Sequence, residues 1–496
     1  MTDKKIIIIG AGIAGLATGY YARLYGYDVD IYEMHNKPGG MCTSWRRKDY
    51  IFDYCIHNLV GTAPQCGIHR VWEELGAFDG TDIIDRDEFA CIETADGRAV
   101  HWYTDLARLT AHLKDIAPDD APIIGELVNA ARKLVGADLF SMQLGGLLRT
   151  FRALPRVPLL NRWSRVYVGE FAARFQDPFL RRALIHVMYD MPGEVVPMTA
   201  LLLFTAGLSE KDLGWPVGGS LALSRRIEKR FLDLGGNILY KTRVEKILLE
   251  NDRAMGVRLA DGTEHKADRV ISAADGYDTI YHMLEGRYLT PNIESYYGGV
   301  GDSSPFGFVI FLGLSKHYPD TPHALTLLLD DSIDLGDIRQ DSLHLVTFGP
   351  ETGLAPDGKS VLKIEVQASY PYWKTRRDAD ISAYREEKQR IADVIIDRIS
   401  FRFPDLREHI EVIDISTPPT AERYTGNRFG WQAGPPSENV GEIQRHGLSR
   451  TLPGLDGFNH VGQWSMANLG VSSAAVMGRN LVKELCRRRG KKFVTG

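Results

Sequence analysis

The chain has 496 residues, a formal net charge of −5 and a sequence pI near 6.3. This length exceeds what one simple core supports, so we expect two intertwined domains. The charge provides no field for nucleic acid, and the five scattered cysteines argue against a disulfide framework. We therefore expect a cytoplasmic protein without a nucleic-acid partner.

The first element is an isoleucine run, Ile6 to Ile9, which leads into a glycine-rich turn. The run has no helical period and is typical of a buried parallel strand. Gly10, Gly12 and Gly15 then allow backbone amides to approach a pyrophosphate at a helix N-terminus. A signal peptide would also begin with an apolar run, but here no cleavage site follows and segment 16–25 continues into a second strand.

A carboxylate ends that second predicted strand, Val29 to Tyr32. Glu33 lies 18 residues beyond Gly15, near the spacing at which an acid accepts the ribose hydroxyls of a dinucleotide. Gly39 and Gly40 would bring more backbone against the same pyrophosphate, a need that NAD domains do not usually have. The pattern therefore predicts FAD as the cofactor.

The following insertion contains a basic and apolar segment, residues 139–169, with five arginines and no acid. Such a segment suits the surface of an anionic membrane. A basic helix pair that covers a substrate domain is an equal alternative, because Pro155 and Pro158 interrupt any long helix. The apolar run 195–209 is shorter than the roughly 20 residues that span a bilayer.

The strand and helix pattern of the first segment returns twice further along the chain. A helix over 220–234, strands at 237–240, 242–247 and 269–273, and a hairpin with Asp261 and Gly262 at its turn are predicted. A second insertion contains a strand over 360–366 and an amphipathic helix over 378–401. The last 40 residues add a strand over 457–462 and a small-residue helix from Gly470, whose first amides can hold the electron-rich edge of a flavin.

These segments predict an α/β fold with two discontinuous domains. The Rossmann-type FAD-binding domain, a parallel sheet with helices, consists of 1–104, 213–284 and 416–496. The α+β substrate domain consists of 105–212 and 285–415. Pieces far apart in the sequence must therefore share one sheet.

The chain resembles the flavin-dependent phytoene desaturase, carotenoid isomerase and retinol saturase superfamily over nearly its full length. The motifs that carry the resemblance are Gly10–Gly15 with Glu33, Pro38–Gly40, Trp215–Gly219, Val244–Ile247, Ser272–Asp275 and Val461–Arg479. The resemblance implies an FAD-dependent oxidoreductase that desaturates, saturates or isomerises carbon-carbon double bonds. It also implies a long apolar tunnel for an isoprenoid, polyene or other lipid, often fed from a membrane surface, so the protein can lie peripherally on a membrane.

The resemblance assigns mostly backbone contacts to FAD. Glycines of the turn and Gly40 would contact the pyrophosphate, Glu33 the ribose, and the Val244 backbone the adenine. The C-terminal residues would contact the ribityl and isoalloxazine end. The predicted cofactor-binding residues are Gly10, Gly12, Ile13, Ala14, Gly15, Glu33, Gly39, Gly40, Met41, Val244, Asp275, Gly462, Gly470 and Val471.

Two departures from the superfamily pattern leave the substrate open. Carotenoid-acting members commonly have a Pro-Gly-Gly-Gly run before the flavin-contacting helix, where this chain has the bulkier Trp464–Gly470. The usual Gly-Gly-Arg reads Gly39-Gly40-Met41, so an arginine contact comes from Arg46 or Arg47 or is absent. A carotenoid substrate does not follow.

No catalytic acid or base is assigned from the sequence. His57, Tyr424 and Trp464 fall in segments expected near the flavin, but a packing or polar-network role is favoured for each. No metal is predicted, because the usual zinc spacing is missing from the set Cys55, His57, Cys66 and His69.

The electron partner also stays open between NAD(P)H, quinone and oxygen. The sequence has no second Rossmann fingerprint, so NAD(P)H has no dedicated domain. Two other functions remain as alternatives. One is an amine-oxidase-like or protoporphyrinogen-oxidase-like flavoenzyme, which shares the Gly-Gly signature, and the other is a non-catalytic flavin-bound protein.

Overall fold

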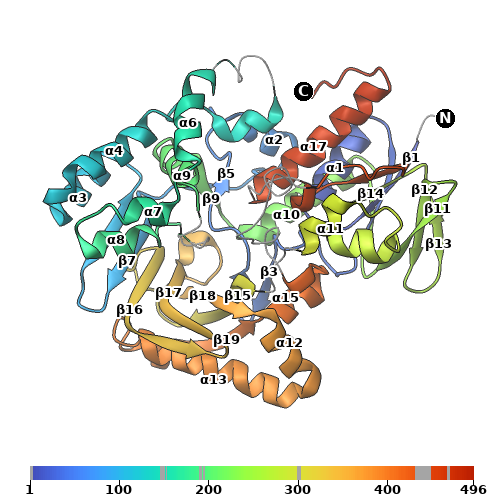
Figure 1. The fold of residues 1–496 in the computed structure, drawn as a ribbon. Helices are drawn as coiled ribbons and strands as arrows, with labels where there is room; N and C mark the ends of the chain where they lie inside the picture. Colours follow the sequence, from blue (N-terminus) through green and yellow to red (C-terminus); the bar gives the residue numbers. More distant parts are fainter. Residues whose placement is uncertain are drawn as a thin grey trace.

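Two large sheets organise the chain in a computed structural model (Figure 1). It describes residues 4–145, 151, 153–188, 193, 196–298, 303–430, 448–465 and 470–495. Three smaller sheets connect or flank the large ones: β3 (Ser44–Arg47) with β4 (Tyr50–Asp53), β9 (Leu213–Pro216) between β5 (Leu59–Val60) and β6 (Ile83–Ile84), and β11 (Val244–Glu250), β12 (Arg253–Leu259) and β13 (Glu264–Lys266).

The first large sheet is parallel and assembles strands from three distant parts of the chain, as predicted. Its order is β10 (Asn237–Leu239), β2 (Asp28–Tyr32), β1 (Lys5–Ile9), β14 (Arg269–Ser272) and β20 (Phe458–His460). The isoleucines of β1 are buried on both faces, because Ile6 and Ile8 pack in one core cluster and Ile7 and Ile9 in another. This explains why the run lacks an alternating polar pattern.

Three helices cover one face of the parallel sheet, and the β11–β12–β13 sheet packs on the other. These helices are α1 (Ile13–Leu24), α10 (Gly219–Asp233) and α17 (Gly470–Arg488). Helices α1 and α17 approach closely at Gly478, where a β-carbon would lie 2.7 Å from the Thr18 backbone nitrogen. The C-terminal helix therefore lies beside the first one (Figure 1).

The second large sheet has seven strands, in the order β19, β15, β18, β17, β16, β7 and β8. Their bounds are β7 Glu88–Thr94, β8 Ala99–Tyr103, β15 Ser303–Leu314, β16 Ala324–Leu335, β17 Ile338–Phe348, β18 Ser360–Ser369 and β19 Ile410–Ser416. Strands β7 and β8 lie within the range 1–104 assigned to the FAD-binding domain, yet β7 pairs in parallel with β16. The domain boundaries stay a prediction.

The helix predicted over 378–401 is α13 (Ile381–Ile399), and a separate helix, α12 (Tyr370–Ala379), precedes it. Asp380 separates them, because it has extended backbone (φ −154°) and its carboxylate accepts hydrogen bonds from the amides of Ser382 and Ala383. An aspartate at this position begins a helix instead of continuing one. The apolar side of α13 packs on one face of the seven-stranded sheet.

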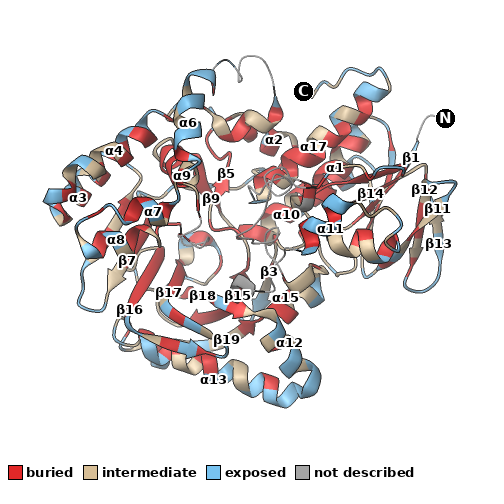
Figure 2. Ribbon diagram, in the orientation of Figure 1, coloured by how far each residue is buried: buried red, intermediate tan, exposed pale blue. Residues whose placement is uncertain are grey.

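Short helices form a third layer beside the second sheet, visible in cyan and green in Figure 1. They include α3 (Leu106–Ile116), α4 (Ala121–Arg132), α6 (Val157–Trp163), α7 (Val168–Ala172), α8 (Pro178–Leu184) and α9 (Met198–Ser209). The other α-helices are α2 (Gly67–Glu74), α11 (Pro291–Gly298), α14 (Leu406–His409) and α15 (Pro418–Thr425). Buried residues concentrate where the layers meet (Figure 2). Within the described ranges, no helix is long and apolar enough to cross a membrane.

Candidate cofactor-binding and active site

A large pocket lies at the carboxyl ends of the parallel strands and contains about 1170 Å³ of empty space. Every predicted cofactor-binding residue except Gly15 lines it. The pocket also has lining that the motifs did not indicate: Tyr32, Met34, Cys42, Cys55, Thr242, Arg243, Ala273, Ala274, Asp278, Met283, Thr425, Gly426, Asn427, Gln463 and Ala474.

Backbone hydrogen bonds fix the glycine turn at one side of this pocket. The Gly10 amide donates to the Tyr32 carbonyl over 2.8 Å, and the Gly39 amide donates to the Ala11 carbonyl over 2.8 Å. Gly15 lies behind the turn, where a β-carbon would be 2.0 Å from the Gly10 carbonyl oxygen. Gly15 is thus required by the packing of α1 against the turn.

Two other glycines border space that no protein atom occupies. Gly12 has φ −65° and ψ 172°, which any residue can adopt, and a β-carbon there would meet only the Gly39 carbonyl oxygen at 3.9 Å. A β-carbon on Gly470 would meet nothing within 4 Å among the atoms described. Gly12 caps α1 without a side-chain hydrogen bond, so the first amides of the helix face the pocket as donors. A pyrophosphate fits this cradle.

Glu33 ends β2 and is bonded to the turn itself. Its carboxylate accepts from the Ala11 amide over 2.7 Å and from the His35 amide over 2.8 Å. Burial raises the pKa of Glu33, and these amides oppose part of that rise. The carboxylate therefore both holds the turn and lines the pocket.

Asp275 is the second buried acid in the lining. It accepts hydrogen bonds from the amides of Asp278 and Arg428. Burial raises its pKa to about 6, although these amides lower it in part. Arg243 also lines this side, with its guanidinium 3.9 Å from the Asp278 carboxylate.

The N-terminus of α17 and the segment after β4 also contribute to the lining. Gly462, Gly470, Val471, Ala474 and Cys55 are the residues concerned. The arrangement suits a planar apolar ring system whose edge accepts hydrogen bonds from helix amides.

Several sequence candidates lie elsewhere. Arg46 and Arg47 are on β3 outside the lining, and Arg47 pairs with Asp414 over 2.7 Å, so the arginine in the described lining is Arg243. Tyr424 is 48% exposed and contacts the His35 ring. The Trp464 side chain and residues 466–469 lie outside the described residues. His57 is buried and bonded to Glu365.

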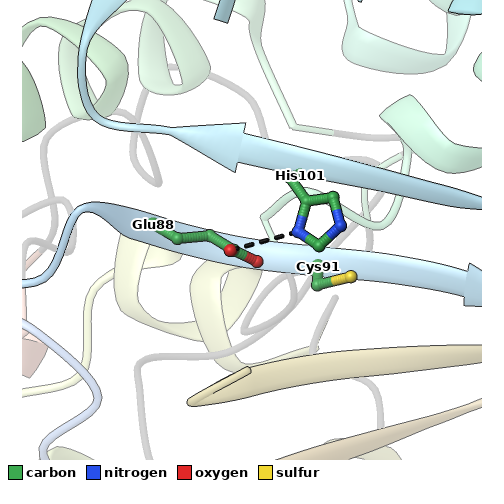
Figure 3. Close-up of side chains that lie close together, drawn as sticks. All are labelled: Glu88, Cys91 and His101. Carbon is green, nitrogen blue, oxygen red and sulfur yellow. Dashed lines mark ion pairs between the residues drawn. The ribbon is translucent and has the colours of Figure 1, made fainter. Parts of the chain in front are cut away.

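A separate triad, Glu88, Cys91 and His101, lies on β7 and β8 (Figure 3). A bulge between Glu88 and Ala90 brings the three ligand atoms within 4.8 Å of one another. His101 pairs with Glu88 over 3.1 Å, and this hydrogen bond raises the pKa of His101. Burial raises the pKa of the Cys91 thiol, which opposes metal binding. In the part of the chain that is described, this is the one such group, so Cys55, His57, Cys66 and His69 do not gather.

Comparison with known proteins agrees with this geometry. Residues 8–75 match the family model of an NAD(P)-binding Rossmann-like domain. Prolycopene isomerase of Daucus carota is 25% identical over 96% of this chain and 79% of its own. A lycopene-forming phytoene desaturase of Pseudescherichia vulneris is 26% identical, covering 86% and 88%. All-trans-retinol 13,14-reductase of Danio rerio is 23% identical, covering 85% and 76%.

The chain is similar over most of its length to carotenoid isomerases, phytoene desaturases and a retinol reductase, which supports the predicted superfamily. It is an FAD-dependent oxidoreductase. A solved oxidoreductase from Methanosarcina mazei has the same fold, with a TM-score of 0.60, 18% identity, and coverage of 97% of this chain and 100% of its own. FAD fits the pocket, because Gly12 and Gly470 leave open space and the amides at the start of α1 can donate to a pyrophosphate.

Proposed function

We propose that this oxidoreductase desaturates, saturates or isomerises carbon-carbon double bonds in an apolar isoprenoid, polyene or related lipid. The observation that carries the proposal is the combination of the pocket with relatives of that chemistry matched over nearly the whole chain. The names of those relatives are the support for an apolar substrate. The substrate itself and the direction of reaction are matters for experiment.

In the proposed complex, backbone groups hold most of the cofactor. The amides of Gly12 and the first turn of α1 bind the pyrophosphate, with Gly40 on its other side. Glu33 binds the adenosine ribose, and the Val244 backbone contacts the adenine. Gly462, Gly470 and Val471 surround the isoalloxazine. When bound, the flavin exchanges two electrons and a hydrogen with a substrate carbon at N5.

The test is an anaerobic absorption spectrum of the FAD-loaded protein during addition of NADPH and then of a polyene such as lycopene or retinol. Bleaching by NADPH and recovery with the polyene indicates saturation. Bleaching by the reduced polyene alone indicates desaturation. A changed polyene isomer, without a net change in the oxidation state of the flavin or the polyene, indicates isomerisation. Peroxide release with an amine or a porphyrinogen, without any change to polyenes, would favour the amine-oxidase-like or protoporphyrinogen-oxidase-like alternative.

We further propose that residues 151–167 contact an anionic membrane surface. Four large apolar side chains are exposed there: Phe151 (65%), Leu154 (53%), Val157 (39%) and Tyr167 (44%). The same segment also packs on the protein, since Trp163 is buried and Arg162 pairs with Glu126. Both the membrane role and the covering role are therefore compatible with this layer.

Co-sedimentation with phosphatidylglycerol vesicles tests the membrane proposal. Phe151→Ser combined with Leu154→Ser should reduce the bound fraction. The control is Leu232→Ser, an exposed apolar residue on α10 outside this segment (43% exposed). Equal binding of both variants and of the unchanged protein would contradict the proposal.

A further inference from the structure

Two cysteines lie opposite each other where the β3–β4 ladder reaches the cofactor pocket. The strands pair in antiparallel register, and the ladder extends past their ends because the Tyr54 amide donates to the Thr43 carbonyl over 3.1 Å. The next pair in this register is Cys42 with Cys55. Both cysteines are free, and both line the cofactor pocket. The ladder therefore brings two thiols together in the wall of this pocket.

The place of this pair in the ladder determines how close the two cysteines come. Thr43 and Tyr54 share a ladder hydrogen bond, so Cys42 and Cys55 form a pair of the non-hydrogen-bonded kind. In such pairs the opposite Cα atoms are about 4.5 Å apart, and the two side chains lie on the same face. Disulfides join Cα atoms that are about 4.4–6.8 Å apart. The two cysteines can therefore form and break an S–S bond with little movement of the backbone.

The surroundings of the two thiols differ. Cys42 is 3% exposed, and its thiol donates to the Ser220 carbonyl over 3.6 Å. The adjacent Cys55 thiol is the main cause that raises the pKa of Cys42 well above its usual value, and burial adds to the rise. Cys55 itself is half-buried. Cys42 therefore keeps its proton, and Cys55 is the thiol of the pair that a small molecule can reach.

Hydrogen bonds hold both cysteine segments against the same helix, α10. Ser224 Oγ donates to the Cys42 carbonyl over 2.7 Å, and the Ile56 amide donates to Ser220 Oγ over 3.0 Å. The Cys42 amide donates to the Gly39 carbonyl over 3.0 Å, so the glycine segment that lines the pocket continues directly into this cysteine. The elements that shape the pocket thus also fix the positions of the two thiols.

The other three cysteines of the chain have different surroundings. Cys66 and Cys91 are buried away from the cofactor pocket, and Cys486 is buried on α17. All five cysteines lie in the described part of the chain, and Cys42 and Cys55 are the two that line this pocket. Disulfides in a reducing compartment are usually transient and catalytic or redox-sensing. A pair of thiols beside a redox cofactor fits the catalytic kind.

We propose that Cys42 and Cys55 form a redox-active pair that passes electrons from a small external dithiol to the bound flavin. The external dithiol attacks the Cys42–Cys55 disulfide, whose S–S bond breaks while the two thiols of the donor become a disulfide. Cys42 and Cys55 then join again. The two electrons and two protons that they lose reduce the bound FAD to FADH₂, so the step balances. A small donor is required because Cys55 lies in the wall of a pocket.

The first measurement detects the pair in the FAD-loaded protein without any turnover. The protein is oxidised with diamide, free thiols are alkylated, and tryptic peptides are analysed by mass spectrometry. Trypsin cuts between the two cysteines at Arg46, Arg47 and Lys48, so a Cys42–Cys55 disulfide joins two peptides that otherwise separate. We expect these linked peptides, and we expect dithiothreitol to separate them. Their absence after oxidation would overturn the inference.

A reductive titration with dithionite then counts the electrons that the oxidised protein accepts after the diamide is removed. The unchanged protein should take up four electrons per flavin, two for the flavin and two for the disulfide. Cys42→Ser and Cys55→Ser should each take up two. The matched control is Cys66→Ser, a buried cysteine whose thiol contacts Asp138 and Ser141, and it should take up four. Uptake of two electrons by the unchanged protein would contradict the pair.

Anaerobic dithiothreitol, a small dithiol, tests the transfer to the flavin. It should bleach the flavin of the unchanged protein and of Cys66→Ser, and the bleaching should be lost in Cys55→Ser. Equal bleaching in all three would overturn the transfer. If a serine variant fails to bind FAD, the linked peptides and the electron count of the unchanged protein still decide. No polyene enters these tests, so this inference and the proposed function can fail independently.

Discussion

Replacing Lys363 by methionine should destabilise the folded protein by about 3–5 kcal/mol at pH 7, the usual cost of leaving a buried charge without its partner. The structure sets this magnitude, because Lys363 is 1% exposed and its partner Glu365 is 0% exposed. Water cannot replace the ammonium at the Glu365 carboxylate, which lies 2.8 Å away. The carboxylate then keeps its contact with His57 Nε2, 2.7 Å away, but loses the ammonium that balances its charge unless it takes up a proton.

The cost should depend on pH with a defined sign. In the unchanged protein the folded pKa of Glu365 is depressed, so its stabilisation is present above the unfolded pKa of about 4.3 and is lost below it. In Lys363→Met we expect a folded pKa above the unfolded value. Stability is then lost as pH rises from about 4.3, by about 1.4 kcal/mol per unit, until the new folded pKa is passed.

Urea unfolding of the FAD-saturated protein, followed by circular dichroism from pH 5 to pH 8, measures both effects. The double variant Lys363→Met with Glu365→Leu removes both charges and should recover most of the loss. A loss below about 1 kcal/mol that does not change with pH would refute the reasoning, because exposed pairs behave in that way. Failure of the double variant to recover would place the loss in packing instead.

Three further predictions concern the pocket and the triad. Gly12→Ala should leave the unfolding of the apoprotein unchanged but weaken FAD binding at least 10-fold in a fluorescence titration. Gly15→Ala, whose β-carbon would lie 2.0 Å from a carbonyl oxygen, should destabilise the apoprotein by about 2–3 kcal/mol. Equal effects of the two variants would contradict the different roles of these glycines. Burial raises the pKa of Asp275 to about 6, so stability should fall by about 3 kcal/mol as pH rises from about 4 to about 6, and Asp275→Asn should flatten that part of a urea-unfolding series. Zinc should not raise the melting temperature, because the Cys91 thiol is held protonated, and a rise lost in Cys91→Ser would show a metal site.

Local patterns predicted the parts of the fold whose determinants are close in sequence. The isoleucine run, the glycine turn and Glu33 lie within about thirty residues and together form one recognisable motif. The structure places them around one pocket. The predicted start at 378 lies within the end of α12, and the hydrogen bonds of the Asp380 carboxylate decide where α13 begins. A capping residue is a stronger boundary signal than periodicity in such a case.

The buried contacts of Glu365 with His57 and Lys363 could not be predicted from any local pattern. His57 and Glu365 are 308 residues apart, and no spacing rule connects a loop histidine to a strand that forms much later in the chain. The charged pattern of β18 did contain a signal. Lys363 and Glu365 alternate with Leu362 and Ile364, so one face of a buried strand was polar. Only the tertiary arrangement shows what that face meets.

The sheet orders also determine when this protein can first bind its cofactor during synthesis. Strand β7 has to wait for β16, more than 200 residues later, and the parallel sheet is complete only when β20 and α17 near the C-terminus have been made. Native contacts that close such long loops form slowly. A ribosome-bound chain that ends before residue 458 lacks one wall of the pocket. Chains that stop before β20 and α17 should therefore retain flavin poorly and leave the ribosome colourless.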